Sequence, residues 1–178
     1  VRGLLTAEIN SITPSLKKYK KYIHLDTKGG VLFLIKSILQ EAGYTITYDL
    51  YDTSYFGVPQ KRERVIMIGS LDKKVYNIPA THSPNTQDKL LPVVTFNQVC
   101  SDLKKHDHIK FDAPRYKYLE MLTEGQNWKN LPLEMQQEAM GNAFYSGGGK
   151  SGFYRRLDSN APSPTLTTSP RMPATMLC

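Results

Sequence analysis

The strongest hydrophobic pattern in the chain covers residues 31–42 and has the period of a helix. Apolar side chains recur there at intervals of three and four residues, and polar side chains fill the positions between them. Gly43 follows directly, and glycine commonly ends a helix. The pattern therefore predicts a helix from Val31 to Ala42, whose buried face consists of Val31, Leu34, Ile35, Ile38, Leu39 and Ala42.

Two segments after this helix have the pattern of β-strands. Tyr44–Tyr51 is rich in aromatic and β-branched side chains that alternate with polar ones. The turn-forming segment Asp52–Pro59 leads into a second strand within Gln60–Gly69, of which Val65–Gly69 is expected to be buried. The order helix, strand, turn, strand predicts part of an α/β sheet that has an antiparallel pair at its edge.

A lysine-rich segment precedes the predicted helix. Thr13 and Pro14 suit the start of a short helix, as its N-cap and first-turn residues. The expected apolar side of this helix consists of Leu16, Tyr19 and Ile23. The outer side consists mostly of Lys17, Lys18, Lys20 and Lys21. Such a surface either faces phosphates or is an ordinary solvated helix face, and the pattern leaves both interpretations open.

The proline content rises and apolar runs become rare after Gly69, and we place a domain boundary near Ser70. The segment Ser70–Pro92 contains several prolines and few apolar runs, which is typical of loops. The other elements that the pattern predicts are short. They are a strand tail at Val1–Leu5, a strand leading into a helix at Val93–Val99, a helix at Ala113–Leu122 and a strand at Thr165–Thr168.

Composition narrows the class of partner. With 178 residues the chain is long enough for one core, or for a partial core and a small second domain. No apolar run approaches 18 residues, so we expect no contact with a membrane interior. The formal net charge of +7 favours a polyanionic partner, although a merely basic soluble domain has the same signature.

The cysteines and histidines do not form a recognisable ligand set. Cys100 and Cys178 lie far apart, without zinc-site or disulfide spacing, and a reducing compartment is expected. The cluster His106-Asp107-His108 lies in a polar, lysine-containing stretch that we interpret as a solvated loop. The sequence therefore predicts no metal site.

The segment Gly57–Gly69, GVPQKRERVIMIG, carries the most distinctive chemistry. If its strand begins near Lys61, Arg62 and Arg64 share one face of the strand, because strand side chains alternate. Two guanidinium groups side by side would suit a phosphate or a base edge, since each offers a rigid fork of donors. The plainer alternative is a solvated run of charges at the start of a strand, neutralised by Glu63.

A glycine-rich loop lies at residues 141–150, GNAFYSGGGK. A phosphate-binding nucleotide loop needs a glycine six positions before its lysine, and Phe144 occupies that position relative to Lys150. Two interpretations remain. The loop either contacts nucleic acid, with Lys150 on a phosphate, or is an ordinary surface loop.

Two of these blocks resemble motifs of one enzyme family, the DNA cytosine-C5 methyltransferases. Gly57–Gly69 resembles motif VIII nearly residue for residue, and residues 151–170 are similar to motif IX and the segment before it. Val1 resembles the last residue of motif VI. Residues 95–103 and 125–132 resemble pieces of the recognition region of the family.

The resemblance implies roles for individual residues. Arg64 would approach a cytosine flipped out of the DNA, and Arg62 would help to hold the site. The expected DNA-binding residues are Gln60, Gly147, Gly148, Gly149, Lys150, Arg155, Arg156 and Thr165.

The resemblance also implies the fold. We expect an α/β protein in which residues 1–70 are the C-terminal part of a Rossmann-like methyltransferase sheet. Residues 71–178 are then a small, mixed, loop-rich target-recognition domain that ends before motif X. Double-stranded DNA is the implied partner, and the implied location is the cytoplasm, at the nucleoid, for a protein encoded by a bacterium or a phage. The implied enzyme either belongs to a restriction–modification system or is an orphan methyltransferase.

Members of this family attack cytosine C6 with a cysteine thiolate and transfer a methyl group from S-adenosylmethionine to C5. The sequence has neither a Pro-Cys pair nor a glycine-rich methyl-donor motif. We therefore expect a C-terminal fragment that lacks its N-terminal catalytic portion and is inactive alone. The alternatives are a self-contained, non-catalytic DNA-binding module and a structural domain that is basic only for solubility.

Overall fold

The computed structural model describes residues 2–23, 27–103, 113–146 and 152–166. The elements, in chain order, are α1 (Arg2–Thr6), η1 (Pro14–Tyr22), α2 (Gly30–Glu41), β1 (Thr45–Asp52), η2 (Thr53–Phe56), β2 (Gln60–Lys61), β3 (Glu63–Ser70), β4 (His82–Ser83), β5 (Leu91–Pro92), α3 (Phe96–Cys100), α4 (Ala113–Glu120), η3 (Trp128–Asn130), α5 (Leu133–Met140), η4 (Gly141–Phe144) and β6 (Ser163–Pro164). Of the described helices, none has the length and hydropathy needed to cross a membrane.

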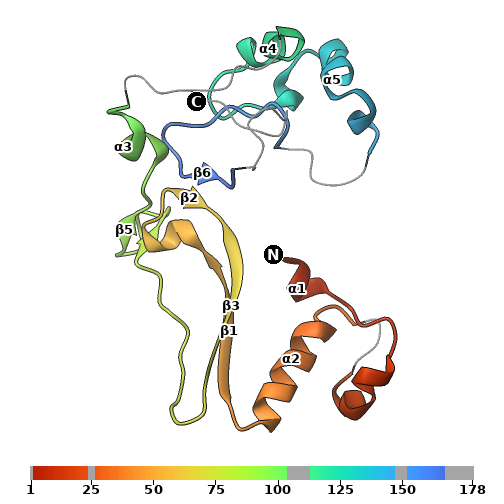
Figure 1. Cartoon of the computed structure of the whole chain (residues 1–178). Helices are drawn as coiled ribbons and strands as arrows, with labels where there is room; N and C mark the ends of the chain where they lie inside the picture. The colour runs from red at the N-terminus through yellow and green to blue at the C-terminus, as the bar shows by residue number, and fades with distance from the viewer. Residues whose placement is uncertain (1, 24–26, 104–112, 147–151, 167–178) are drawn as a thin grey trace.

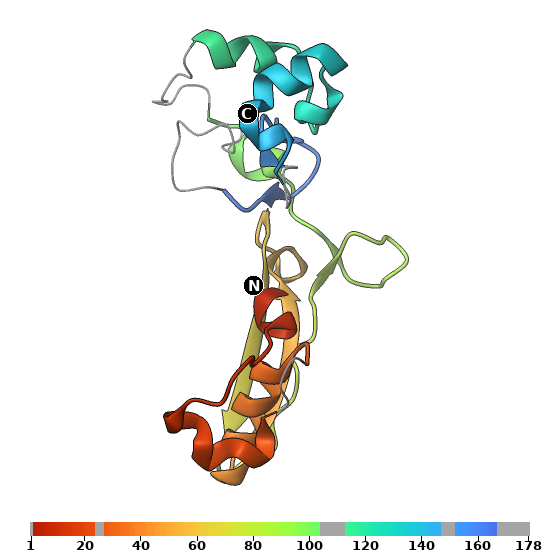
Figure 2. The ribbon, with the colours of Figure 1, turned by 90° about the vertical axis from the view of Figure 1, so that its right-hand side faces the viewer.

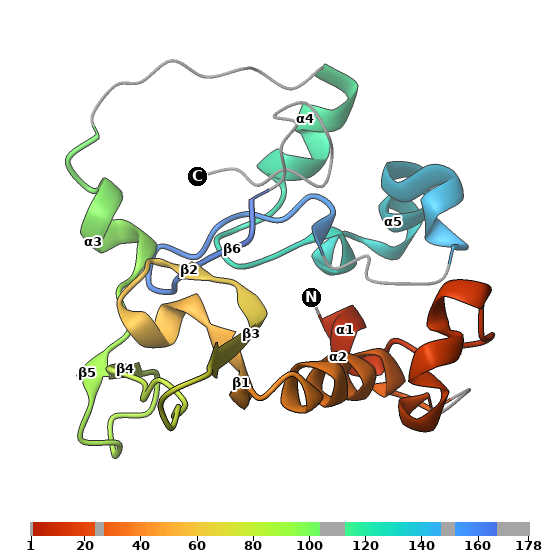
Figure 3. The same ribbon diagram turned by 60° about the horizontal axis from the view of Figure 1, so that its bottom comes forward.

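The largest regular unit is a β-hairpin with a helix beside it. Strands β1 and β3 pair antiparallel over eight residues, from Thr45 opposite Ser70 to Asp52 opposite Glu63. Helix α2 runs alongside the hairpin, and α1 lies against both α2 and β3 (Figures 1 and 3). The predicted order of helix, strand, turn and antiparallel strand is therefore confirmed, with the helix bounds shifted by one residue.

The hairpin is less buried than its sequence predicts. None of the residues Val65–Gly69 is buried, and the side chain of Ile66 is 42% exposed. Among the described residues, β1 and β3 form a sheet of only two strands, so no further strand covers their sides. An apolar run predicts that a strand can be buried, but the covering layer has to come from elsewhere.

Three short predicted elements differ from the structure. Residues Arg2–Thr6 form a helix where a strand tail was expected. The segment η1 is a 3₁₀ helix with a half-buried row of Leu16, Tyr19 and Tyr22, and Ile23, which follows as its C-cap, is half-buried as predicted. The strand expected to start at Val93 is the two-residue β5, which ends at Pro92, and α3 begins at Phe96, directly after Thr95, which forms a capping box with Gln98. The cap decides this case because it satisfies the free amide groups of the first helical turn.

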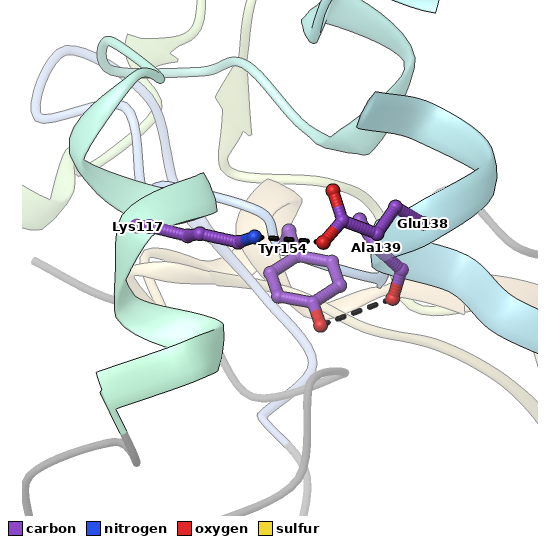
Figure 4. A network of polar contacts seen from close by, with 4 residues as sticks. All are labelled: Lys117, Glu138, Ala139 and Tyr154. Carbon is purple, nitrogen blue, oxygen red and sulfur yellow. Dashed lines mark hydrogen bonds and ion pairs between the residues drawn. The ribbon is translucent and has the colours of Figure 1, made fainter. Parts of the chain in front are cut away.

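The C-terminal half of the described chain has a core of its own. The predicted helix at Ala113–Leu122 is confirmed as α4, whereas α5 was not predicted. Figure 4 shows how the two helices meet. Lys117 of α4 pairs with Glu138 of α5 at 2.8 Å, and the Tyr154 hydroxyl donates to the Ala139 carbonyl at 3.1 Å. The buried core consists of Tyr118, Leu119, Leu122, Trp128, Leu131, Met140 and Tyr154.

The two parts of the molecule meet at a parallel pair of very short strands, β2 and β6. Figures 1 and 2 show an elongated molecule, with the hairpin and α2 at one end, α3–α5 at the other, and β2 beside β6 between them. The described residues form three sheets of two strands each. The mixed α/β class is therefore confirmed. The single Rossmann-like sheet and the division at Ser70 stay predictions.

Candidate nucleic-acid interface

The candidate site is built on the turn between β1 and β3, which is fixed by hydrogen bonds of its own. The buried carboxylate of Asp52 accepts from the amide of Ser54 at 3.0 Å and from its hydroxyl at 2.8 Å. The Thr53 hydroxyl donates to the Gln60 carbonyl at 2.5 Å, and the Thr53 amide donates to the Arg62 carbonyl at 3.1 Å. These bonds hold the backbone of residues 60–62 against the start of η2. The backbone of the basic segment is therefore fixed in position.

Gly57 closes the turn in a way that other residues could not. Its φ of +80° lies in the left-handed region, and a Cβ built there would lie 2.8 Å from Cε1 of His82. Strand β4, which contains His82, is held beside the turn by the Thr81 amide, which donates to the Tyr55 carbonyl at 3.0 Å. A segment about 25 residues further along the chain therefore supports the turn.

The two candidate arginines lie at the end of the hairpin that faces β6. Arg64 stands directly opposite the buried Tyr51 and is itself half-buried. Its Nη1 donates to the Glu63 carbonyl at 2.7 Å. Arg62 separates β2 from β3, because the antiparallel ladder begins only at Glu63. The shared face of Arg62 and Arg64, which assumed a strand continuous from Lys61, stays a prediction.

The β2–β6 pair joins the two blocks that the sequence singled out. Gln60 is the partner of Ser163, whose amide donates to the Pro59 carbonyl at 2.9 Å. The Thr165 hydroxyl donates to the Lys61 carbonyl at 3.3 Å, across 104 residues of chain. Gln60 and Thr165, both predicted DNA contacts, therefore lie in the two segments that β2 and β6 bring side by side (Figure 3).

The segment before β6 is also held in place from the other side. The carboxylate of Glu124 accepts from the amide of Ser159 at 3.0 Å and from its hydroxyl at 2.6 Å, and these bonds lower the pKa of Glu124. The first amides of α3, on Phe96 and Asn97, donate to the carbonyls of Ala161 and Ser159. The chain therefore reaches β6 along a defined path that links α3, β2 and the C-terminal core.

Arg155 and Arg156 lie away from this junction, on the C-terminal core. The backbone amide of Arg156 donates to the Gln126 carbonyl at 2.9 Å, and its Nη1 donates to the Leu119 carbonyl at 3.4 Å. Its Nε is buried without a partner among the described residues. The guanidinium of Arg156 is thus directed toward protein, and DNA binding by both arginines stays a prediction. Gly147, Gly148, Gly149 and Lys150 lie outside the described residues.

Neither a metal site nor a methyl-donor site is built by the described residues. No group of three or more histidine, cysteine, aspartate or glutamate side chains is placed to hold a metal ion in the ranges that the structure describes. His106 and His108 lie outside those ranges. A nucleotide-like donor such as S-adenosylmethionine typically lies on a glycine-rich turn between a strand and a helix. Within the described chain, β1 leads into η2 and β3 into Ser70-Leu71-Asp72, so these residues do not fit that group.

Sequence reasoning missed the residues that support the site. Asp52 and Thr53 cap the turn, His82 packs against Gly57, and Ser163 donates across the junction. The role of Asp52 could have been predicted from the sequence, since an aspartate two residues before a serine at a strand end is typical of a cap. His82 and Ser163 had none, because their partners lie far away in the sequence.

Comparison with known proteins gives a consistent result. The family model described as C-5 cytosine-specific DNA methylase matches residues 21–175. The type II methyltransferase M.PspPI of Psychrobacter sp. is 31% identical over the whole chain, which covers 45% of that protein. M.Eco47II of Escherichia coli is 32% identical over 84% of the chain and 37% of its own length. M.Sau96I of Staphylococcus aureus is 28% identical over 99% of the chain and 42% of its own length. The chain therefore spans less than half the length of these relatives.

Proposed function

The chain belongs to the family of C-5 cytosine-specific DNA methylases, and from this premise we propose that it forms the target-base pocket wall and the DNA-recognition part of a DNA (cytosine-5-)-methyltransferase. The observation that supports this role most directly is the junction between β2 and β6. There Gln60, Lys61 and Arg62 lie beside Ser163 and Thr165, and Arg64 follows at the start of β3.

The geometry of this junction suits a base that has left the DNA stack. Enzymes that act on a base inside duplex DNA extrude it into a pocket and hold it by hydrogen bonds to its edge. In our proposal the guanidinium of Arg64 donates to the extruded cytosine, and Arg62 holds the adjoining backbone. Neighbouring residues hold both arginines in place. The carbonyl of Arg62 accepts a hydrogen bond from the Thr53 amide, and Arg64 is the strand partner of Tyr51.

The methyl transfer itself needs groups that this sequence does not contain. In the full enzyme, S-adenosylmethionine supplies the methyl group and a cysteine attacks the ring. Cys100 follows Val99 and Cys178 follows Leu177, so the sequence contains no Pro-Cys pair. We propose that the nucleophile and the donor site belong to the rest of the enzyme, which works in the cytoplasm of a bacterium or phage host as part of a restriction–modification system.

The chain alone provides the first test of this proposal. We expect the purified chain to bind duplex DNA at low salt and to incorporate no label from methyl-labelled S-adenosylmethionine. Labelled DNA would contradict the assignment of the missing groups to another part of the enzyme. Absence of binding to any duplex at low salt would contradict the recognition role.

A second candidate, a self-contained DNA-binding module, is favoured by one observation. The C-terminal part buries seven hydrophobic side chains in a cluster of its own, which indicates that it can fold without a catalytic domain. The two functions separate when the rest of the enzyme is added. If the chain and the rest of the enzyme together transfer methyl groups to DNA, the pocket-wall role is supported. If the chain only binds DNA as before and no methyl transfer occurs, the self-contained module is supported.

A further inference from the structure

The 3₁₀ helix η1 arranges a lysine-rich sequence into regular rows. A 3₁₀ helix has three residues per turn and rises about 2 Å per residue, so side chains three positions apart stand above one another at about 6 Å. One row consists of Leu16, Tyr19 and Tyr22, all half-buried. The other two rows carry the lysines of the segment, which are all exposed: Lys17 with Lys20, and Lys18 with Lys21.

One of the four lysines is used to hold η1 on α2. The ammonium of Lys21 pairs with the carboxylate of Glu41, the last residue of α2, at 2.5 Å. This hydrogen bond raises the pKa of Lys21 and lowers the pKa of Glu41. Lys21 also lies over the ring of Tyr22, with its Nζ 4.6 Å from the ring centre. The row of half-buried side chains and this ion pair together fix the orientation of the segment.

The other three lysines have no such partner in the part of the chain that the structure describes. Of the lysines in that part, Lys21 forms an ion pair with Glu41, and Lys117 forms one with Glu138. Lys18 lies over the ring of Tyr19 at 4.6 Å, which steadies its stem without neutralising its charge. Lys17, Lys18 and Lys20 therefore form a positively charged surface on a fixed support. We call these three residues the lysine ridge.

The lysine ridge lies far from the candidate base pocket. Glu41 ends α2 four positions before Thr45, the first residue of β1, whereas Arg64 pairs near the last residue of β1. A strand of eight residues spans about 26 Å at 3.3 Å per residue. Figures 1 and 2 agree with this separation, since η1 lies toward the end of the molecule that is remote from β2 and β6. Any ligand of the ridge is therefore distinct from the target base.

We propose that the lysine ridge binds phosphate groups of the duplex DNA backbone at a distance from the target base. This inference rests on the proposed function, since a DNA methyltransferase brings a long polyanion to the molecule. The side-chain chemistry fits phosphate, because lysines act as point charges that bind phosphate without reading the bases. A membrane surface fits poorly, since an interfacial helix turns its apolar side outward, whereas the apolar row of η1 is half-buried in a segment that lies against α2.

The salt dependence of DNA binding tests this proposal. Each phosphate contact adds about 0.9 to the slope of log K against log salt concentration for B-form DNA. For the full chain carrying Lys17→Gln, Lys18→Gln and Lys20→Gln, we expect the slope to fall by about 2–3, with unchanged preference among DNA sequences. The matched control is Lys17→Arg, Lys18→Arg and Lys20→Arg. It changes the same three exposed lysines but keeps their positive charge.

The outcomes are distinct. A reduced slope in the ridge variant and a nearly unchanged slope in the control support the ridge as a DNA contact. Equal slopes for wild type and ridge variant, with wild-type binding intact, overturn the ridge and leave the proposed function standing. Equal reductions in both triple variants show that the loss does not come from the charge of the ridge and also overturn it. Failure of the wild-type chain to bind duplex DNA at low salt contradicts the ridge and the recognition role together.

Discussion

At the scale of single residues, the candidate pocket depends on how Arg64 and Lys61 differ. They lie three positions apart in one basic segment, but they belong to different strands. Arg64 is half-buried in β3 opposite Tyr51, whereas Lys61 is exposed in β2 and contributes its carbonyl to the bond with Thr165. A backbone contact survives a change of side chain. The structure therefore indicates that the site needs the side chain of Arg64 but only the main chain of Lys61.

Substitution of these two residues in the complete methyltransferase should give unequal results. We expect Arg64→Ala to lower the methylation rate about 10- to 100-fold, because losing one charged hydrogen bond costs roughly 1.5–3 kcal/mol. We expect Lys61→Ala to lower it less than threefold. The measurement is single-turnover methylation of duplex DNA, with circular dichroism to confirm folding. Equal losses in the two variants would refute the different roles that we assign to them.

The residues of the site could be predicted from sequence only in part. Gln60, Arg62, Arg64 and Thr165 were identified because the blocks that contain them resemble known motifs. The structure adds that Gln60 pairs with Ser163 and that Thr165 bonds to the carbonyl of Lys61. Gly57 could be recognised as a turn residue, but the contact of His82 with it could not. A contact between distant segments leaves no local pattern in either of them.

At the scale of elements, α4 was predicted although it has no strong apolar side. The hydrophobic pattern predicted α2, β1 and β3 from an apolar side, an alternating pattern and an apolar run, respectively. It missed α5, whose sequence LEMQQEAM places few apolar residues on one side. It also gave η1 a helical period without distinguishing the 3₁₀ form, because the two periods differ little over nine residues. The 3₁₀ form adds Tyr22 to the half-buried residues, and Ile23 is half-buried as predicted.

The packing of α4 and α5 makes the C-terminal core sensitive to high pH through Tyr154. Burial raises the pKa of its hydroxyl above the ordinary value of 10.0. Above pH 10 the unfolded chain therefore releases this proton while the folded chain retains it, so stability is present below pH 10 and falls as the pH rises further. We expect Tyr154→Phe to cost about 1 kcal/mol at pH 8, from the lost bond to Ala139, and to weaken the decline above pH 10.

Urea denaturation between pH 8 and pH 11, followed through Trp128 in the same core, measures this effect. The matched control is Tyr76→Phe, because Tyr76 is 72% exposed in the segment after β3. The control should keep the decline of the wild type. A Tyr154→Phe variant whose stability falls as steeply as that of the wild type above pH 10 would show that another group is responsible.

At the scale of the whole molecule, the sequence predicted two parts but not how they are joined. The hairpin with α2 and the C-terminal core each follow from local patterns and local burial. Their junction is a pair of two-residue strands, separated by about 100 residues of chain. Two residues are too few to produce a strand pattern, so this part of the architecture emerges only in three dimensions. The candidate site lies at this junction and depends on it.

Removal of one hydrogen bond at the junction tests this dependence. The amide of Ser163 donates to the Pro59 carbonyl, and Ser163→Pro removes that donor. We expect a loss of about 1 kcal/mol, separation of the two parts, and weaker binding of duplex DNA, while each part keeps its helices. The larger radius of gyration should be visible by small-angle X-ray scattering, and circular dichroism reports the helices.

The matched control for this change is Ser163→Ala, which keeps the amide and removes only the hydroxyl bond to the Pro164 carbonyl. Its scattering and DNA binding should remain those of the wild type. If Ser163→Pro leaves both unchanged, the β2–β6 pair is not what holds the parts together, and the contacts of α3 with Ser159 and Ala161 become the stronger candidate. If both variants separate, the buried hydroxyl rather than the amide fixes the junction. The pair of variants thus identifies the group on which the arrangement of arginines, Gln60 and Thr165 depends.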